Sequence, residues 1–412
     1  MGTIRIEADL LVPGRGDPVG DGTVLIDDGR ITYAGPTTDA PATTAPATRV
    51  ATVMPGLWDS HVHFMGVLDL DLGKLLQEAH SVFVARAVRS AADVLQAGFT
   101  SVRELGGHGV YLAHAIDEGT LDGPTIYGAG SILSPTGGHA DFHGRSLATL
   151  MDYSAHEGAT QLCDGVPDCL RAVRLQLRKN ARVIKVCASG GVLSEVDHPV
   201  HQQFSGEELR AIVEEAGRAE RAVAAHCHGK PGIMAALEAG VRTIEHGTYL
   251  DVEAATAMRE AGAVLVATRS IVARMTRAVD QVPPFAAAKI RAIVERHAEA
   301  MQVAREGGVA VAAGTDFATV GPTTLAPLGR NGEELEHLVA AGYTPLEAIE
   351  AATANAPATL GAQAPRSGLL AAGYDADVIA VDGDPTADIA LLADPVHVTH
   401  VWKAGRAVKA PQ

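Results

Sequence analysis

The sequence predicts an α/β fold, a (β/α)8 TIM barrel that carries a small β-sandwich domain built from both chain ends. Eight short apolar runs rich in Val, Ile and Thr recur through the middle of the chain, and helical patterns lie between most of them. Both chain ends instead contain short strands broken by Gly and Asp turns. We therefore expect residues 1–55 and 362–412 to form one discontinuous β domain and residues 56–361 to form the barrel.

The first fifty residues predict strands joined by tight turns. The stretches TIRIEADLLV and GTVLIDDGRITYAGP have the pattern of hairpins, with Asp28-Gly29 at one of the turns. The stretch TTDAPATTAPATR is rich in Pro and Thr and predicts an exposed connection. At the other end, DADVIAVDGD and VTHVWKAGRAVKA are again short strands broken by turns, so the two ends are expected to assemble into one domain.

The middle of the chain supplies the strands and helices of the barrel. After the strand that contains His61, the predicted strands are FTSVREL, PTIYGAGSIL, ARVIKVCAS, RAVAAHCH, RTIEHGT, AVLVATR and VAVAAGTD. Capping boxes begin two of the helices, one at Ser205 with Glu208 and one at Thr344 with Glu347. A doubly wound open sheet is the alternative architecture, but no glycine-rich phosphate loop follows the first strand.

Composition and charge argue against several classes of protein. The 412 residues include 33 Lys and Arg against 49 Asp and Glu, and the net charge of −16 argues against a nucleic-acid or anionic-membrane partner. The four Cys residues do not form a spaced framework and suit a reducing compartment. We find no secretory signal, and no apolar run approaches the roughly 20 residues of a membrane span. We therefore expect a cytoplasmic protein.

Potential metal ligands stand at the ends of five predicted strands. His61 and His63 are two residues apart in an extended strand, so both imidazoles point to the same side. The later strands contribute Lys185, His226, His228, His246 and Asp316. A lone buried His is usually a core residue, and a lone Asp at a strand end usually caps a helix. Five such strands favour a metal site, because the carboxyl ends of barrel strands converge.

Lys185 lies inside the apolar run RVIKVCA, where a charged and unpaired amine would be unfavourable to bury. One interpretation is a salt bridge with a nearby acid. The other is that the neutral amine has reacted with carbon dioxide, which would give a carbamate whose oxygens can bridge two metal ions. The sequence leaves both interpretations open.

These residues belong to motifs that resemble those of the amidohydrolase superfamily over essentially the whole chain. The motifs are DSHVH, VIKVCASGG, AHCHGKPGI, IEHGTY, AAGTDFA and, near the end, GYDADVIAVDGDP. Within the superfamily, the chain most resembles the branch of Xaa-Pro and Xaa-Arg/Lys dipeptidases and the related ochratoxin-hydrolysing amidases. The resemblance implies a binuclear metal centre in a barrel that carries a small β-sandwich.

The resemblance also implies a role for each ligand. The implied ligands are His61, His63 and Asp316 for the buried metal ion, His226 and His246 for the second ion, and a carboxylated Lys185 as the bridge. The motif AHCHG contains two histidines, so the fifth-strand ligand is ambiguous. The first of them, His226, lies twenty residues before the sixth-strand histidine, as in the branch that the chain resembles, and is assigned for that reason.

The expected chemistry follows from such a centre. Two divalent cations that share a water lower the pKa of that water toward neutrality. Asp316 could take the proton from the water and later pass it to the departing amine. We expect zinc, because the ligands are imidazoles and carboxylates without thiolates. Cys227 lies between two candidate ligands in the sequence, and alternation along a strand points it away from the site.

The residues expected to bind substrate lie next to the ligands, where cationic and hydrogen-bonding groups could hold a substrate carboxylate. The candidates are His139, His143, His228, Tyr249 and Arg269. The resemblance supports His139 and His228 in this role more than the others. We leave Arg103 out of the site, because it could pair with Glu104 or another acid at the barrel mouth.

Three hypotheses about function remain. The favoured one is an enzyme that hydrolyses an amide bond and releases an amino acid with a free α-carboxylate from a dipeptide, an N-acyl amino acid or an ochratoxin A-type amide. The second keeps the metal centre but changes the substrate to a cyclic amide or imidazolone. The third is a catalytically silent scaffold, against which the complete set of ligands argues. We expect a small-molecule substrate and a homo-oligomer.

Overall fold

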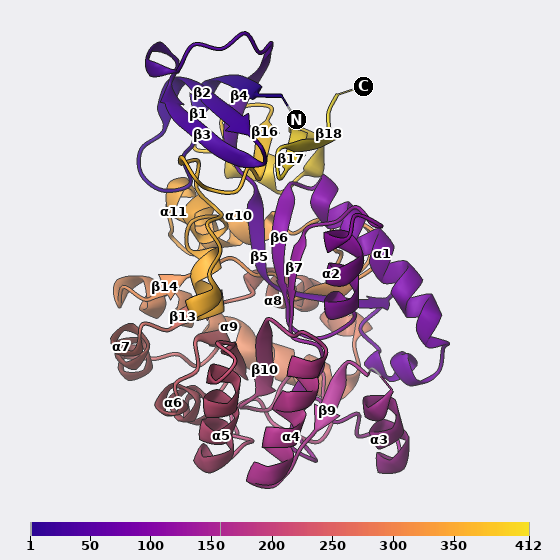
Figure 1. Cartoon of the computed structure of the whole chain (residues 1–412). Coiled ribbons are helices and arrows are strands. Elements are labelled where there is room, and N and C mark those ends of the chain that lie inside the picture. Colours follow the sequence, from indigo (N-terminus) through magenta and orange to yellow (C-terminus); the bar gives the residue numbers. More distant parts are fainter. Residues whose placement is uncertain (1, 157, 412) are drawn as a thin grey trace.

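Strands from both chain ends lie side by side in one β domain, as the computed structural model of residues 2–156 and 158–411 shows (Figure 1). The strands are β1 (Ile4–Leu11), β2 (Val19–Asp27), β3 (Arg30–Pro36), β4 (Ala47–Pro55), β16 (Val378–Val381), β17 (Val398–Lys403) and β18 (Arg406–Lys409). Their order is β18-β17-β16-β4-β1-β2-β3, and β1 runs parallel to β4 while the other pairs are antiparallel. The β domain predicted from both ends is confirmed, and its strands form one continuous sheet.

The two faces of this sheet pack against different cores. In β16, Val378 and Ala380 join a core within the β domain, whereas Ile379 and Val381 join the large core of the barrel. This follows from the two-residue alternation of a strand. The backbone of Gly56, which joins β4 to the barrel, donates to the carbonyl of Asp377 at 2.9 Å and ties the two parts together.

Two parallel sheets form the barrel. One has the order β14-β13-β12-β11-β10-β8-β9 and the other β15-β5-β6-β7. Their strands are β5 (Leu57–Val67), β6 (Phe99–Glu104), β7 (Thr125–Gly128), β8 (Ile132–Ser134), β9 (Thr160–Leu162), β10 (Val183–Cys187), β11 (Ala222–Cys227), β12 (Thr243–His246), β13 (Val264–Val266), β14 (Ala310–Val311) and β15 (Phe317–Thr319). Backbone hydrogen bonds of 2.8 Å from Arg182 to Gly128 and from Ser60 to Ala313 join the sheets. The (β/α)8 barrel is confirmed, and the doubly wound open sheet is not what forms.

Helices cover the outside of the barrel (Figure 1). They are α1 (His80–Gln96), α2 (Gly109–Asp117), α3 (Leu147–Ala155), α4 (Gly165–Arg178), α5 (Gly206–Gly217), α6 (Lys230–Ala239), α7 (Val252–Ala261), α8 (Arg269–Arg277), α9 (Pro284–Glu306), α10 (Glu333–Ala340) and α11 (Pro345–Ala351). The capping boxes predicted at Ser205 and Thr344 begin α5 and α11, where each hydroxyl accepts the backbone N–H of the Glu three residues on.

Shorter 3-10 turns connect several of these elements. They are η1 (Thr37–Asp39), η2 (Leu72–Leu76), η3 (Val279–Gln281), η4 (Ala356–Gln363), η5 (Ile389–Leu392) and η6 (Pro395–His397). In the described residues, no helix has both the length and the apolar composition to span a bilayer. The strands of the barrel are nearly all buried on both faces, which accounts for their continuous apolar runs.

Candidate metal centre

The predicted ligands converge at the carboxyl ends of the barrel strands. Lys185 lies on β10, His226 on β11 and His246 at the end of β12. His61 and His63 lie on β5, and Asp316 immediately precedes β15. The five histidine and lysine side chains are buried in the barrel mouth. Parallel strands that point the same way bring these side chains together from positions up to 255 residues apart in the sequence.

Short contacts link four of the predicted ligands. Asp316 Oδ1 lies 3.1 Å from His63 Nε2 and 3.4 Å from His61 Nε2. Lys185 Nζ lies 3.3 Å from the same His61 nitrogen. His61 Nε2 therefore sits at the centre of this half of the site, within reach of both a carboxylate and an amine.

Two groups of potential ligand atoms overlap at His246. The first joins His61, His246 and Asp316, and the second joins His226, His228 and His246, with the atoms of each group within 4.8 Å of one another. Each group has three donors close enough together to be a candidate site for one metal ion. The fifth-strand ambiguity persists in the structure, because both His226 and His228 face His246.

The tautomer of His61 is set by a buried acid. Its Nδ1 lies 2.8 Å from Glu245 Oε2, and because a carboxylate only accepts, Nδ1 carries the proton and Nε2 presents its lone pair to the site. Glu245 is in turn held by the fully buried Arg103, whose Nη2 lies 2.7 Å from Oε1. Burial raises the pKa of Glu245, but Arg103 and His61 lower it to about 2, so the acid stays ionised.

Backbone carbonyls orient two further rings. His63 Nδ1 donates to the carbonyl of Gly106 at 2.9 Å, which leaves Nε2 open. His226 Nε2 donates to the carbonyl of Gly190 at 3.1 Å, which leaves Nδ1 open. Burial lowers the pKa of His226 well below its usual value, so this ring is neutral, the form that binds a metal ion.

Threonine hydroxyls bond the remaining two rings. His228 Nδ1 lies 2.7 Å from Thr248 Oγ1, and His246 Nδ1 lies 2.7 Å from Thr268 Oγ1. The backbones of His246 and Thr268 have φ values of +68° and +55°, in the left-handed region that non-glycine residues rarely adopt. Such strain persists only where the surroundings impose it and clusters at functional sites.

Asp316 shares this strained backbone, with φ of +60°, and is held by a second buried acid. Asp59 Oδ2 accepts hydrogen bonds of 2.7 Å from Thr315 Oγ1 and Asn331 Nδ2, and its Oδ1 accepts from the backbone of Thr315 and of His61. Asp59 thereby fixes the turn that carries Asp316 against the strand that carries His61. This role was not predicted from the sequence, although Asp59 stands within the motif DSHVH and, two residues before His61, shares its face of β5.

Lys185 forms no ion pair with an acid among the described residues, so the simple salt bridge considered from the sequence is not observed. Burial lowers the pKa of Lys185, which favours its neutral amine. Burial also raises the pKa of Asp316, but His61, His63 and Lys185 outweigh it and hold that pKa well below its usual range. Asp316 thus faces the lysine and two imidazoles as an ionised carboxylate.

The residues predicted to bind substrate occupy different positions around this cluster. The ring of His139 stacks on that of His226, with centroids 4.3 Å apart, and His228 lies within the cluster itself. His143 accepts a weak hydrogen bond of 3.4 Å from the backbone of Val196, and its buried Nε2 has no hydrogen-bond partner among the described residues.

The other two candidates, Tyr249 and Arg269, lie next to residues that hold the cluster. The backbone N–H of Tyr249 donates to the carbonyl of His228 at 2.9 Å. The Arg269 guanidinium donates from Nη1 to His297 Nδ1 at 2.8 Å, and His297 Nε2 donates to the backbone carbonyls of Ala267 and His246. Arg269 thus contacts His297, which in turn donates to the backbone carbonyl of His246.

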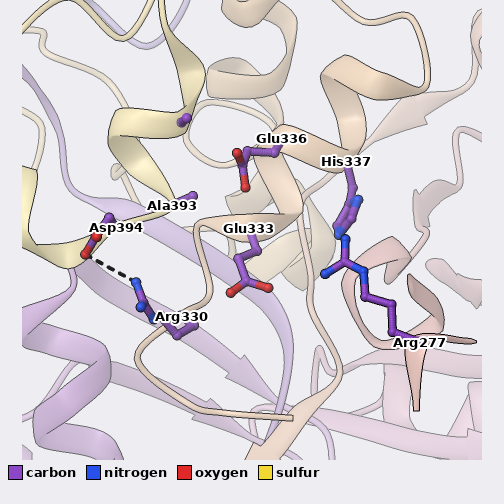
Figure 2. Close-up of a pocket in the computed structure, with 8 residues that line it drawn as sticks. Arg277, Arg330, Glu333, Glu336, His337, Ala393 and Asp394 are labelled. Carbon is purple, nitrogen blue, oxygen red and sulfur yellow. Dashed lines mark ion pairs between the residues drawn. The ribbon is translucent and has the colours of Figure 1, made fainter. Parts of the chain in front are cut away.

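A separate cavity of about 320 Å³ opens on the surface between α8, α10 and η5 (Figure 2). It is lined by Arg277, Arg330, Glu333, Glu336, His337, Ala390, Ala393 and Asp394. None of these residues belongs to the predicted site, and Arg330 is paired with Asp394 at 3.2 Å. We therefore assign the chemistry to the barrel mouth and not to this cavity.

Comparison with known proteins gives the same result. A family model described as the amidohydrolase family matches residues 52–408. Ochratoxinase from Aspergillus niger is 44% identical over 98% of this chain and 86% of its own length. The crystal structure of A. niger ochratoxinase superposes with a TM-score of 0.92 at 41% identity, covering 99% of this chain and 96% of that chain.

Two further solved structures are similar over the whole chain. A prolidase complexed with N-methylphosphonate-L-proline has a TM-score of 0.90 at 32% identity, with 100% of both chains covered. A Xaa-Pro dipeptidase with methionine bound in its active site has a TM-score of 0.89 at 29% identity, covering 99% of this chain and 100% of that chain. The resemblance drawn from the motifs is confirmed. This chain belongs to the amidohydrolase family and is a hydrolase of carbon–nitrogen bonds.

Proposed function

We propose that this protein is a binuclear metal-dependent amidohydrolase that releases an amino acid with a free α-carboxylate. Its substrate is a dipeptide, an N-acyl amino acid or an amide of the ochratoxin A type. One observation carries the proposal: two groups of buried potential ligands overlap at His246, in a chain whose relatives include an ochratoxinase and prolidases.

The donor set fits a pair of zinc ions. His61, His63 and Asp316 would hold one ion, His226 and His246 the other, and a carboxylated Lys185 would bridge them. Ligands of imidazole and carboxylate without thiolate favour zinc over softer metals. Bound there, divalent cations lower the pKa of a water toward neutrality and polarise the scissile carbonyl.

Asp316 moves the proton in this proposal. Its pKa lies well below the usual range despite burial, because His61 and His63 stand beside it, so it starts the reaction ionised and able to accept. It takes a proton from the attacking water and gives it to the departing amine. Asp59, Thr315 and Asn331 hold the turn that aims this carboxylate.

His139 and His228 bind the α-carboxylate of the leaving amino acid. Both lie against the ligand cluster, where a carboxylate two or three bonds from the scissile carbon can reach them. The ligands in the two dipeptidase-like structures are an amino acid and a proline derivative, which supports a site shaped for amino acids. A bound carboxylate positions the carbonyl, and a badly placed carbonyl reacts slowly.

A change in the substrate tests this function. Converting the α-carboxylate of an N-acyl amino acid to an amide should lower kcat/KM by at least roughly tenfold, the value of one charge-assisted hydrogen bond. His139→Ala should cause a similar loss on the free acid and little further loss on the amide. If the native enzyme cleaves both substrates equally well, the carboxylate pocket does not exist. Hydrolysis of cyclic amides in that case would favour the imidazolone type of substrate.

A further inference from the structure

Lys289 connects two distant parts of the barrel mouth. It lies on α9, which follows β13, and contacts a segment, residues 190–203, that follows β10. Strands β11 and β12 separate β13 from β10 in the sheet. The ammonium donates to the carbonyl of Gly191 at 3.0 Å, to the carbonyl of Ser194 at 2.6 Å and to Asp197 Oδ1 at 3.2 Å. All three of its N–H groups are therefore used inside this one segment.

Asp197 accepts hydrogen bonds from other residues of the same segment. Its Oδ2 accepts from the backbone N–H of Gly191 at 2.9 Å and from Gln203 Nε2 at 3.0 Å, and its Oδ1 accepts from Ser194 and Lys289. The Asp197 side chain is only 5% exposed and that of Lys289 only 11%. An ion pair this buried and this fully bonded has a defined geometry, unlike an exposed pair.

The segment also decides which nitrogen of His139 carries a proton. Ser194 Oγ lies between Asp197 Oδ1 and His139 Nδ1, with the latter at 2.8 Å. A carboxylate only accepts, so the single hydroxyl proton of Ser194 goes to Asp197. Ser194 Oγ must then accept from His139, whose Nδ1 keeps its proton whether the ring is neutral or charged. Nε2 is the atom left for a substrate.

Packing fixes the plane of the same ring. A Cβ atom at Gly191 would lie 2.1 Å from Cε1 of His139, so only glycine fits there. The ring of His139 also stacks on that of His226. The backbone N–H of His139 donates to Gln203 Oε1 at 3.0 Å. The ring is thus held by contacts from the segment and from His226, while 23% of its side chain stays exposed.

We propose that Lys289, Asp197 and Ser194 are positioning residues for His139. Lys289 anchors residues 190–203 to α9 across the barrel mouth, and we call these three hydrogen bonds the strap. The anchored segment sets the tautomer and the plane of the His139 ring. The effect on catalysis rests on the proposed function, in which His139 binds substrate, but the strap itself does not. None of the three residues is expected to touch the reacting atoms.

Replacing Lys289 with Met tests the strap without leaving a buried charge on the helix. Hydrogen–deuterium exchange of peptides from residues 190–203, followed by mass spectrometry, should become at least tenfold faster in K289M. The matched control is K409M, because Lys409, on β18 of the β domain, also donates to two backbone carbonyls, that of Gln96 at the end of α1 and that of Pro395. K409M should leave exchange in residues 190–203 unchanged, and K289R should restore much of the protection.

Two further readouts connect the strap to His139. In the native chain with ¹⁵N-labelled histidine rings, the signal that disappears in H139A should show Nδ1 protonated, with Nε2 protonated only when an amino-acid carboxylate is bound. K289M should average the two nitrogens. With metal content unchanged, K289M should lower kcat/KM on the free acid by at least tenfold, with no additional loss in the H139A background. Unchanged exchange in K289M, or an unchanged His139 signal despite faster exchange, would overturn the proposal. If the native chain hydrolyses no amide, the proposed function fails. The hydrogen–deuterium exchange of residues 190–203 and the ¹⁵N signal of His139 still test whether Lys289 holds the segment.

Discussion

The ligand side and the substrate side of the barrel mouth are held in different ways. On the ligand side, Glu245 on β12 and Arg103 on β6 hold His61 on β5, and the carbonyl of Gly106 holds His63. On the substrate side, His139 depends on residues 190–203, which are strapped from the other side by Lys289. The first arrangement is built into the sheet, whereas the second is a loop held by side chains. Metal binding and substrate positioning should therefore fail separately.

Removing the proposed bridge should have the largest effect. Lys185→Ala should lose both bound metal and activity, because the proposed bridging carboxyl group is removed. If the bridge is a carbamate, short carboxylic acids added to the buffer should restore part of the rate. Metal content by plasma mass spectrometry and initial rates with and without the acid measure this. An unmodified Lys185 amine in active, metal-replete protein would refute the carbamate.

The proton carrier should be separable from the metal ions. Asp316→Asn should lower kcat by at least about 10²-fold, because the proton acceptor is lost while an oxygen ligand remains. Metal content should stay close to that of the native chain. The comparison of kcat and metal content in the same preparation checks this, and near-normal turnover would mean that another group moves the proton.

Breaking the buried support of His61 should weaken metal binding without loosening the loop. Arg103→Met leaves the Glu245 charge buried without its main partner, and the metal affinity should fall about 10- to 100-fold. Exchange in residues 190–203 should not change. Arg174→Met is the control, since Arg174 pairs with Glu215 at 2.7 Å on the outer helices. Competition with a chromophoric chelator measures the affinity. Equal affinities in the two variants would show that the strands do not support the site in this way.

The smallest effect concerns a buried acid that the proposed chemistry does not use. Burial raises the pKa of Glu104 to about 7 from an ordinary 4.5, so the native state binds more protons than the unfolded state between these values. The contribution of Glu104 to the free energy of unfolding should therefore fall as the pH rises through this window, by at most about 3 kcal/mol. Glu104→Gln should remove this decrease, and the exposed Glu238→Gln should not. Denaturant unfolding of the metal-free chain at pH 5 and pH 8 measures the difference, and identical slopes in both variants would contradict it.

The positions of the ligands could be predicted from the sequence because they depend on local spacing. A two-residue alternation places His61 and His63 on one face, and the convergence of strand ends brings Lys185 and His246 to them. The partners of these ligands could not be predicted in the same way. Arg103 was expected to pair with Glu104 or another acid, and closure of the barrel selects Glu245, 142 residues away. No sequence pattern encodes that choice.

The contacts of residues 190–203 could not be predicted from the sequence either. The motif VIKVCASGG indicated Lys185, but nothing in the sequence indicated that Asp197 and Ser194 would hold His139 or that Lys289 would reach them from α9. These contacts depend on the path of a fourteen-residue segment between β10 and α5. Side chains on such a segment are placed by tertiary contacts, whereas those on a strand are placed by the period of the strand.

Metal content measured together with activity tests the central claim most directly. The metal-free chain is equilibrated with zinc, freed of excess ion and analysed for bound zinc and for hydrolysis of an N-acyl amino acid at each loading. The account predicts two zinc ions per chain and activity that rises with occupancy. A folded chain that binds less than one ion, or whose hydrolysis is the same with and without metal, would contradict it and would revive the silent scaffold.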